Sequence, residues 1–402
     1  MLAMNDKDRY LKEVKKRKER KKLCIYGAGR KAIGLLKLLR TAEIYPEAFL
    51  VSNANENRAE EEGLPIIDIH ENKYLPEETL ILIGVRERWI SDVVKTLCEE
   101  GYSDYIEPPE GIEYLLEGDL DRSRHTVLQI TAQIGCRIAC KYCPQELFVR
   151  KYSEDKAREL SLTLDNFKRF VDQTEKDVII DFAGFSEPFF NPDCVGMIKY
   201  AVDTGHPVEL FTTLVGVDKQ TFEEIKGIPF REVVLHIPDQ EQNSKIPITE
   251  EYLELLKTVM EAKKPDGRPF ADWASCHGEI ADEIQEIIRG KLRVITQLHD
   301  RAGNLENQEL EKQVGKKGPI RCSNTESIYH NHNVLLPDGT IILCDSDWGM
   351  KHVLGNLRRN TYQEILHGQK SIEIQSMRES ENGDVICRNC CYAVPCDVRR
   401  KG

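Results

Sequence analysis

The sequence predicts an α/β protein with two parallel-sheet domains, followed by a small cysteine-rich α+β domain. Two long stretches, 22–118 and 119–310, alternate apolar strand-like runs with helical segments, a pattern typical of parallel sheets. Many of the 13 cysteines gather at short spacing in 136–143 and 387–396, as ligands of one metal centre must. A chain of 402 residues is too long for one ordinary core, so several domains are expected.

The composition excludes several classes of protein. A formal net charge of −12 argues against a general nucleic-acid binder, which needs a basic surface. No apolar run reaches the roughly 20 residues that span a bilayer, and the N-terminus lacks the apolar core of a secretory signal. We therefore expect a cytoplasmic protein without a membrane span. Residues 1–21 are rich in lysine and arginine and predict a charged, solvated helical arm.

Residues 22–118 predict a Rossmann-like domain. A first apolar strand is followed by Gly27, Gly29 and Gly34 and then by a helix, which meets the dinucleotide fingerprint in part. The acidic residue expected about 20 positions further on is absent, because the second strand ends at Ser52. This absence argues against NAD. It leaves a nucleotide or nucleotide-sugar site and a purely structural or docking module as alternatives.

Residues 119–310 predict a partial (β/α)6 TIM-like barrel. In such barrels the chemistry takes place at the C-terminal ends of the strands. The six expected strands are 126–132, 177–184, 206–213, 232–238, 268–275 and 291–298.

Residues 311–402 form the last predicted domain, the small cysteine-rich α+β domain. The polar stretch 302–320 is typical of a linker that leads into it. A Pro-Asp-Gly turn at 337–339 separates two apolar runs and predicts a β-hairpin. A short helix is expected over 361–368.

Three cysteines follow the first barrel strand with the spacing C-x3-C-x2-C: Cys136, Cys140 and Cys143. Three thiolates on one short loop can hold three irons of a 4Fe–4S cube and leave the fourth iron open to a cofactor. A structural zinc ion, the alternative, would usually take four protein ligands.

This segment resembles the radical S-adenosylmethionine superfamily, in which the same spacing binds the radical-generating 4Fe–4S cluster. The resemblance implies that Tyr142 contacts the adenine of S-adenosyl-L-methionine. The segment 182–193 resembles the glycine-rich segment of that family, which ends in Glu-Pro, and so assigns Gly184, Ser186 and Glu187 to the cofactor's amino group. It further implies reductive cleavage of the cofactor to a 5′-deoxyadenosyl radical and a reducing electron donor such as flavodoxin or ferredoxin.

Polar residues end the next two barrel strands. Thr212 and Thr213 end the third strand, and His236 and Asp239 flank the end of the fourth. All four side chains can point toward the cofactor or substrate, and Thr212 and His236 are our candidates for cofactor contacts. Ordinary capping of the strand ends is the alternative.

The C-terminal cysteines resemble the auxiliary-cluster extension called SPASM, or its shorter relative, the twitch domain. The set lacks the last cysteines of the full pattern, so one auxiliary 4Fe–4S cluster is expected, since a cube needs about four thiolates. The assigned ligands are Cys322, Cys344, Cys387 and Cys390, and Cys396 or Cys391 can replace one of them. A zinc-ribbon site is the alternative.

The resemblance leaves the substrate open. The N-terminal domain favours a sugar or a nucleotide-sugar or polysaccharide intermediate, and thus a role in carbohydrate metabolism by dehydrogenation or epimerisation. Epimerisation needs a hydrogen-atom donor, and Cys276, near the end of the fifth strand, is the candidate; a buried core cysteine is the alternative. A second hypothesis is a maturase that modifies ribosomal peptides or proteins. A third is a zinc-bound scaffold without enzymatic activity.

Overall fold

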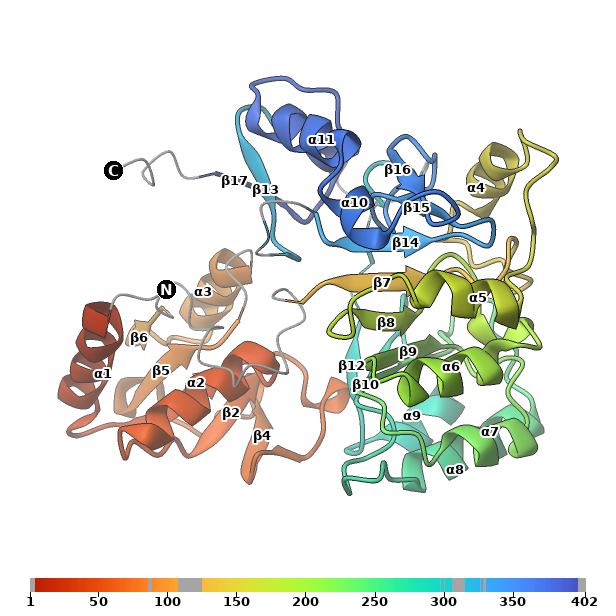
Figure 1. Ribbon diagram of the computed structural model, residues 1–402. Helices are drawn as coiled ribbons and strands as arrows, with labels where there is room; N and C mark the ends of the chain where they lie inside the picture. Colours follow the sequence, from red (N-terminus) through yellow and green to blue (C-terminus); the bar gives the residue numbers. More distant parts are fainter. Residues whose placement is uncertain are drawn as a thin grey trace. The chain divides into compact units, whose positions relative to one another are not determined.

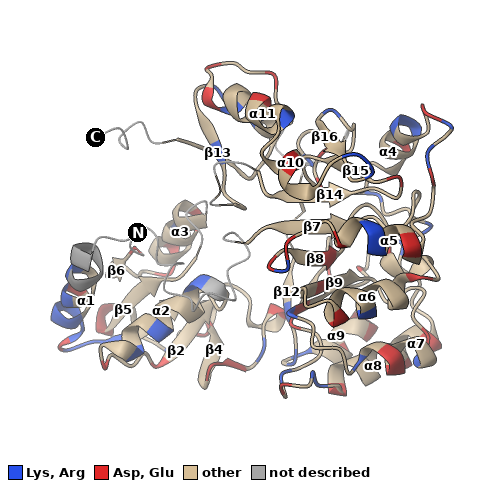
Figure 2. Ribbon diagram, in the orientation of Figure 1, with Lys and Arg blue, Asp and Glu red and all other residues tan. Residues whose placement is uncertain are grey.

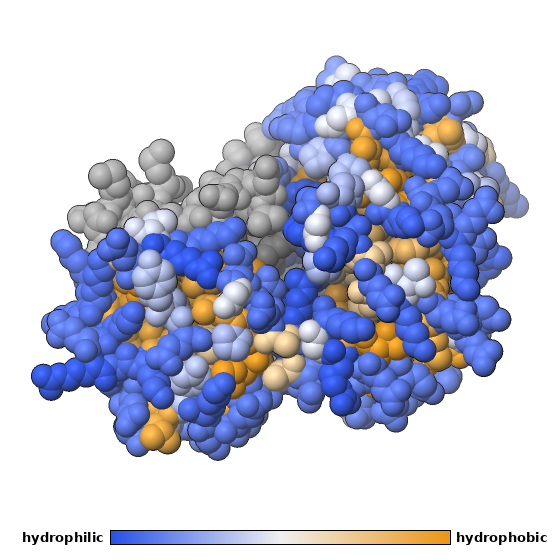
Figure 3. All heavy atoms as spheres, turned by 90° about the horizontal axis from the view of Figure 1, so that it is seen from below, coloured by the Kyte–Doolittle hydropathy of each residue, from blue (hydrophilic) through white to orange (hydrophobic). Residues whose placement is uncertain are grey.

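The computed structural model describes residues 4–85, 89–107, 125–296, 298–299, 301–305, 315–325, 327 and 330–396. The chain forms two compact units, Met1–Asp121 with Ile288–Arg293 and Arg122–Ile287 with Val294–Gly402. Hydrophilic residues cover most of the face shown in Figure 3, and hydrophobic residues form small patches on it. Within the described residues, no helix is both long and apolar enough to cross a membrane.

A six-stranded sheet with the order β3-β4-β2-β1-β5-β6 is the centre of the first unit (Figure 1). The neighbours from β4 to β6 pair in parallel, and β3 pairs antiparallel with β4. Parallel neighbours need long connections, which α2 (Arg30–Thr41) and α3 (Ile90–Glu99) supply. The predicted Rossmann-like sheet is confirmed. Its strands are β1 (Lys22–Tyr26), β2 (Ala48–Val51), β3 (Glu60–Glu61), β4 (Leu64–Asp68), β5 (Thr79–Ile83) and β6 (Tyr105–Ile106).

The N-terminal arm is a helix, α1 (Met4–Lys18), but it is not solvated on every side. Tyr10 and Val14 are 6% and 0% exposed and belong to the hydrophobic core of the first unit. At the end of the helix, Arg17 donates to Asp104 over 3.0 Å, and Lys21 pairs with the same carboxylate at 2.8 Å. The prediction of a solvated arm is therefore wrong for one face, while Arg9, Lys12, Lys15 and Lys16 are exposed. Figure 2 shows lysines and arginines along the described part of α1.

The second unit contains a nine-stranded sheet with the order β12-β11-β10-β9-β8-β7-β14-β15-β16. Its first six strands follow one another in sequence, as in the predicted partial barrel, and the pairs from β7 to β11 are parallel. The fold class is thus the one predicted. The six strands are β7 (Val127–Ile130), β8 (Ile179–Phe182), β9 (Val208–Thr212), β10 (Glu232–His236), β11 (Trp273–Ser275) and β12 (Arg293–Ile295).

Helices connect the barrel strands and cover the sheet (Figure 1). Thr163, Asp218 and Thr249 cap three of them, because their side-chain oxygens accept hydrogen bonds from backbone N–H groups of the first turn. The helices are α4 (Gln145–Tyr152), α5 (Leu164–Val171), α6 (Cys194–Asp203), α7 (Lys219–Ile225), α8 (Glu250–Glu261) and α9 (Asp282–Ile288).

The C-terminal region continues the barrel sheet. β14 (His332–Leu335) pairs in parallel with β7, and β15 (Thr340–Ile342) pairs antiparallel with β14 across the predicted hairpin turn. Phe148, Phe185 and Trp348 pack between α4, the end of β8 and this hairpin. The remaining elements are β13 (Ile320–Cys322), β16 (Val353–Asn356), α10 (Tyr362–Leu366), α11 (Gln369–Glu379) and β17 (Ala393–Pro395).

Candidate functional site

The loop with the first three cysteines follows β7 and rests on the loop that follows β10. Cys136, Cys140 and Cys143 are free, half-buried thiols. Cys140 Sγ donates to the carbonyl of Ser244 over 2.9 Å, and the N–H of Lys141 donates to the carbonyl of Asn243 over 2.8 Å. Two distant loops thus meet at the C-terminal edge of the parallel sheet, which is the edge where the sequence predicts the chemistry.

Asp239 holds this supporting loop in place. Its carboxylate is 2% exposed and accepts hydrogen bonds from the backbone N–H groups of Asn243, at 2.7 Å, and Ser244, at 2.8 Å. The sequence analysis considered Asp239 as a group that points toward cofactor or substrate. In the structure both carboxylate oxygens bind the loop after β10 on which the triad loop rests.

The triad lies beside charged and aromatic groups that act on its thiols. A hydrogen bond with Cys140 is the largest cause that lowers the pKa of Cys143, and the nearby Arg301 guanidinium lowers it further. Burial raises the pKa of Cys136, which receives a backbone hydrogen bond from Glu187. Tyr142 is 5% exposed, and its ring meets the ring of His277 edge-on at 4.5 Å.

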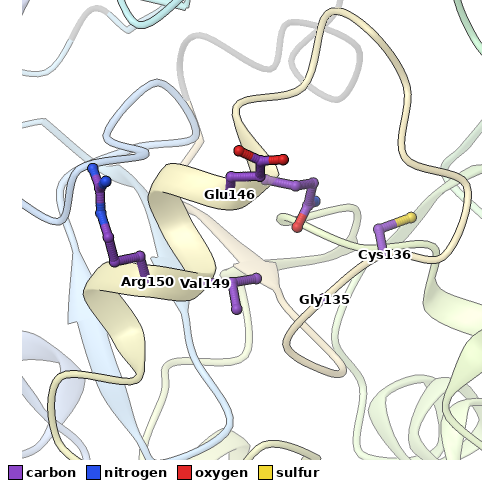
Figure 4. Close-up of a pocket in the computed structure, with 6 residues that line it drawn as sticks. Gly135, Cys136, Glu146, Val149 and Arg150 are labelled. Carbon is purple, nitrogen blue, oxygen red and sulfur yellow. The ribbon is translucent and has the colours of Figure 1, made fainter.

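A pocket of about 400 Å³ opens beside Cys136 (Figure 4). It lies between the triad loop and α4, and Glu146 and Arg150 give its wall one charge of each sign. The pocket reaches one cysteine of the triad from the side of α4, as its lining residues Gly135, Cys136, Gln145, Glu146, Val149 and Arg150 show.

Glu187 links the end of β8 to the end of β9. The carboxylate is 4% exposed and accepts hydrogen bonds at 2.7 Å from the hydroxyl of Thr212, from the hydroxyl of Thr213 and from the N–H of Thr213. Burial raises the pKa of Glu187, and these bonds oppose that rise. Thr212 and Thr213 therefore hold the carboxylate in position beside Cys136, as strand-end capping groups do.

Gly184 and Ser186 occupy the turn before Glu187. Gly184 has a φ of +60°, and a Cβ there would lie 2.4 Å from Thr131 Oγ1, so no larger residue fits. Ser186 is 9% exposed, and its Oγ has no hydrogen-bond partner among the described residues. A buried hydroxyl without a partner is costly, so this oxygen is suited to a bound polar group.

A row of three polar side chains follows at the ends of β10 and β11. His236 Nδ1 lies 3.1 Å from Ser275 Oγ, and Ser275 Oγ lies 3.3 Å from His277 Nε2. Burial and the Arg301 charge lower the pKa of His236 to about 4, and the same two causes come first in lowering that of His277 to about 2. The sequence analysis found His236 and missed Ser275, His277 and Arg301; the position of Ser275 and His277 at a strand end was a usable signal.

Cys276 lies between these residues in sequence but is buried. It is 1% exposed, its thiol donates to the carbonyl of Pro238 over 3.7 Å, and its N–H donates to the carbonyl of Ile295. Successive side chains of a strand point to opposite faces, so Cys276 points away from the side of Ser275 that meets His236.

The four C-terminal cysteines assigned from the sequence lie near enough to one another to act on one another's pKa. Burial, and then the nearby Cys322, raise the pKa of Cys387 to about 12. Burial is also the largest cause that raises the pKa of Cys344, and Cys387 adds to it. The pKa of Cys390 is also raised, and a hydrogen bond with Cys391 is the largest cause of this rise. Cys344 and Cys322 raise it further.

Cys396 lies apart from this group. In the antiparallel pair of β13 and β17, Cys322 stands opposite Ala393 and Ile320 stands opposite Pro395. The N–H of Cys396 donates to the carbonyl of Pro319 over 2.9 Å. Three positions along a strand span about 10 Å, so Cys396 sits at the far end of the ladder from Cys322. Cys391 is hydrogen-bonded to Cys390. Of the two cysteines named as possible replacements, Cys391 therefore lies nearer to the group than Cys396 does.

Arg388 fixes the loop that carries Cys387 and Cys390. The side chain is 8% exposed, and its guanidinium donates five hydrogen bonds to backbone carbonyls at 2.6 to 2.9 Å. Every N–H of the group is thus used, which is the full donor capacity of arginine. The accepting carbonyls are those of Gly383, Lys316, Gly318, Met377 and Ser380.

The two cysteine groups have the donors that iron–sulfur clusters take. Each supplies thiols alone, three in the triad and four in the C-terminal group, and thiolates are the usual ligands of such clusters. Among the described residues, no three His, Cys, Asp or Glu side chains are grouped as ligands of a single metal ion.

The chain was compared with curated protein sequences and with solved structures. No curated protein sequence matches the chain. A structure of BtrN in complex with AdoMet and 2-DOIA is similar at 14% identity and a TM-score of 0.44, over 66% of this chain and 93% of that one. A structure of Streptococcus suis SuiB bound to precursor peptide SuiA is similar at 14% identity and a TM-score of 0.45, over 75% and 82%. Native anSMEcpe with bound AdoMet and Cp18Cys peptide has 14% identity and a TM-score of 0.38, over 66% and 86%.

A family model matches the C-terminal region. The model is SPASM, an iron–sulfur cluster-binding domain, and the match covers residues 327–391. This segment includes Cys344, Cys387 and Cys390, three of the four converging thiols. The predicted extension is thereby confirmed, because residues 327–391 match the SPASM model of iron–sulfur cluster-binding domains.

Proposed function

We propose that the protein is a radical S-adenosylmethionine enzyme that removes a hydrogen atom from a sugar or from a nucleotide-sugar or polysaccharide intermediate. The observation that carries this proposal is the triad of Cys136, Cys140 and Cys143 on the loop after β7, beside the unpartnered hydroxyl of Ser186. The SPASM domain on the same sheet adds a second iron–sulfur site.

In this proposal the two cysteine groups have separate roles. The triad holds the radical-generating cluster, and Cys322, Cys344, Cys387 and Cys390 hold the auxiliary cluster. When bound, the first cluster and S-adenosylmethionine supply a 5′-deoxyadenosyl radical, and the auxiliary cluster accepts an electron.

The chain's own residues position the cofactor and keep water out. Ser186 Oγ and the backbone around Gly184 bind the cofactor's amino group, with Glu187 locked beside them by Thr212 and Thr213. Tyr142, largely buried beside the triad, contacts the adenine. Because these side chains are held in place before the cofactor binds, less conformational entropy is lost when it binds.

Cofactor cleavage tests the proposal. The anaerobically reconstituted protein, reduced with dithionite and given S-adenosylmethionine, should form 5′-deoxyadenosine. A variant with all three triad cysteines changed to alanine should lose about 100-fold or more of that activity, because it lacks the three thiolates that hold the cluster. As the matched control, Cys98→Ala changes an exposed cysteine in the first unit. Equal cleavage by the triad variant would contradict the proposal.

The substrate class needs a separate measurement. We expect UDP-sugars to raise the rate of 5′-deoxyadenosine formation above the rate without substrate, and ribosomal peptides to leave it unchanged. The N-terminal unit supports this preference, because its sheet has a Rossmann-like strand order and Gly29 precedes the first turn of α2. A rate increase with peptides alone would assign the protein to the peptide- or protein-modifying maturases.

The reaction outcome is tested at Cys276. Its burial and its bond to the carbonyl of Pro238 favour dehydrogenation over an epimerisation that uses this thiol. We expect the product of the whole enzyme to be a ketone and Cys276→Ala to form it at the wild-type rate. An epimer whose formation stops in Cys276→Ala would reverse this choice and identify the thiol as the hydrogen-atom donor.

A further inference from the structure

The row formed by His236, Ser275 and His277 has a geometry that the cofactor does not explain. His236 and Ser275 are register partners at the ends of the parallel strands β10 and β11. The hydroxyl of Ser275 lies between His236 Nδ1, at 3.1 Å, and His277 Nε2, at 3.3 Å. One hydroxyl therefore bridges one nitrogen of each imidazole.

A bridging hydroxyl couples the proton positions of the two rings. Serine has one O–H proton, so it donates to one nitrogen and accepts from the other. Burial and the Arg301 charge lower the pKa of His236 to about 4, so this ring is neutral near pH 7. His277, with a pKa of about 2, is neutral as well. Two neutral rings joined in this way must have the same tautomer, both Nδ1–H or both Nε2–H, so one of the two outer nitrogens is unprotonated.

The surroundings of His277 determine which outer nitrogen, His236 Nε2 or His277 Nδ1, is unprotonated. His277 Nδ1 is buried and forms no hydrogen bond of normal length among the described residues, but the Thr296 backbone raises the pKa of this ring, as a nearby accepting carbonyl does. A carbonyl accepts but cannot donate, so it favours a proton on Nδ1. Ser275 then donates to His277 Nε2 and accepts from His236 Nδ1. His236 Nε2 is left unprotonated, and no described residue donates to it.

We propose that His236 is the catalytic base of this site and accepts the proton of a substrate hydroxyl through Nε2, with Ser275 and His277 as positioning residues. The inference rests on the proposed function and deepens it, because it names an alcohol as the substrate. Oxidation of H–C–O–H to C=O removes one hydrogen atom, one electron and one proton. The 5′-deoxyadenosyl radical takes the hydrogen atom, the auxiliary cluster takes the electron, and His236 takes the proton.

The position of the row supports this role. The ring of His277 contacts Tyr142, which lies between two triad cysteines, at 4.5 Å. His236 is partly exposed, and its ring lies 6.2 Å from that of Phe211 on the neighbouring β9. Arg301 is the charged group that acts on both imidazoles, and His299 also acts on His277. A positive neighbour disfavours a second positive charge, so the base stays ready to accept a proton.

Diethyl pyrocarbonate tests the assignment without a known substrate, because it acylates unprotonated imidazole nitrogens. The anaerobic holoenzyme is treated at pH 7.0 and pH 5.5, with N-acetylhistidine in the same tube as control, and peptide mass spectrometry locates the acyl groups. An imidazole with a pKa of about 6.5 should react about eightfold more slowly at pH 5.5. We expect the His236 rate to change less than about 1.5-fold between the two pH values, and His277 to stay unmodified.

A matched variant tests the bridge itself. In Ser275→Ala, His277 Nε2 loses its donor, so a second acyl group should appear on His277. Acylation of wild-type His277 in preference to His236 would overturn the assignment. A His236 rate that follows N-acetylhistidine, or an unmodified His236, would overturn it as well.

Cofactor cleavage by the untreated enzyme is measured in parallel. If His236 reacts as expected while no 5′-deoxyadenosine forms, the proposed function fails. The conclusion that His236 Nε2 is unprotonated then still stands. If cleavage occurs but His236 does not react as expected, the base assignment alone fails.

Discussion

Replacement of Arg388 should remove the auxiliary cluster and leave the triad cluster in place. The five carbonyls that accept from its guanidinium belong to two segments, 316–318 and 377–383, that lie apart in the sequence. A hydrogen bond to a charged group contributes about 1.5–3 kcal/mol, and a buried carbonyl left without a donor costs about 1–3 kcal/mol. If local opening hydrates half of these carbonyls in Arg388→Ala, two or three stay without a donor at about 1.5 kcal/mol each, and the loop loses about 4 kcal/mol of local stability.

Two measurements check this value. Hydrogen–deuterium exchange of peptides from 383–392 should become about 1000-fold faster in Arg388→Ala, since 1.4 kcal/mol corresponds to a factor of ten. Iron content should fall from about eight to about four atoms per chain, as expected for loss of one cube. Arg388→Lys should fall between wild type and Arg388→Ala, because an ammonium has three donors and lacks the planar fork.

The matched control is Arg359→Ala, at an exposed arginine between β16 and α10. It should leave both the exchange rates and the iron content at wild-type values. Wild-type exchange and eight iron atoms in Arg388→Ala would refute the reasoning, because they would mean that the five bonds contribute nothing to the loop.

Three further predictions concern the glycine turn, the cysteine ligands and pH. Gly184→Ala should lower cofactor cleavage and the unfolding temperature, because its Cβ would lie 2.4 Å from a hydroxyl, whereas Gly227→Ala, with open space around its Cβ, should change neither. Cys390→Ala should lose about four iron atoms per chain and Cys396→Ala none, as iron analysis will show. The pKa of His236 is lowered to about 4 in the folded chain. On acidification His236 is therefore protonated in the unfolded chain before it is protonated in the folded chain, which favours unfolding. Stability should therefore be complete above pH 6.5 and fall by about 3 kcal/mol between pH 6.5 and 4 in urea titrations, with a smaller fall in His236→Gln.

The strands and the grouping of the triad cysteines could be predicted because their signals are local. All six expected barrel strands contain an observed strand, since buried parallel strands are continuous apolar runs. Cys136, Cys140 and Cys143 lie within eight residues of one another, so their spacing alone places them together. The hairpin before Cys344 was similarly fixed by its Pro-Asp-Gly turn.

The remainder depends on contacts between distant segments. Ser275 meets His236 only because β10 and β11 pair in one particular register. Arg388 looks like any surface arginine in the sequence, and its burial follows from carbonyls that lie up to 72 positions away. In α1, Tyr10 and Val14 gave too weak an apolar pattern to predict that one face would be buried.

The pairing of β14 with β7 has a consequence for how the chain can be divided. Without β14, the first strand of the barrel would present a row of unpaired N–H and C=O groups, and such edges recruit strands from other molecules. A protein truncated before residue 327 would thus expose the unpaired edge of β7 and should aggregate during expression. The C-terminal region that matches SPASM is therefore no detachable accessory, because its strand β14 pairs with the first strand of the barrel.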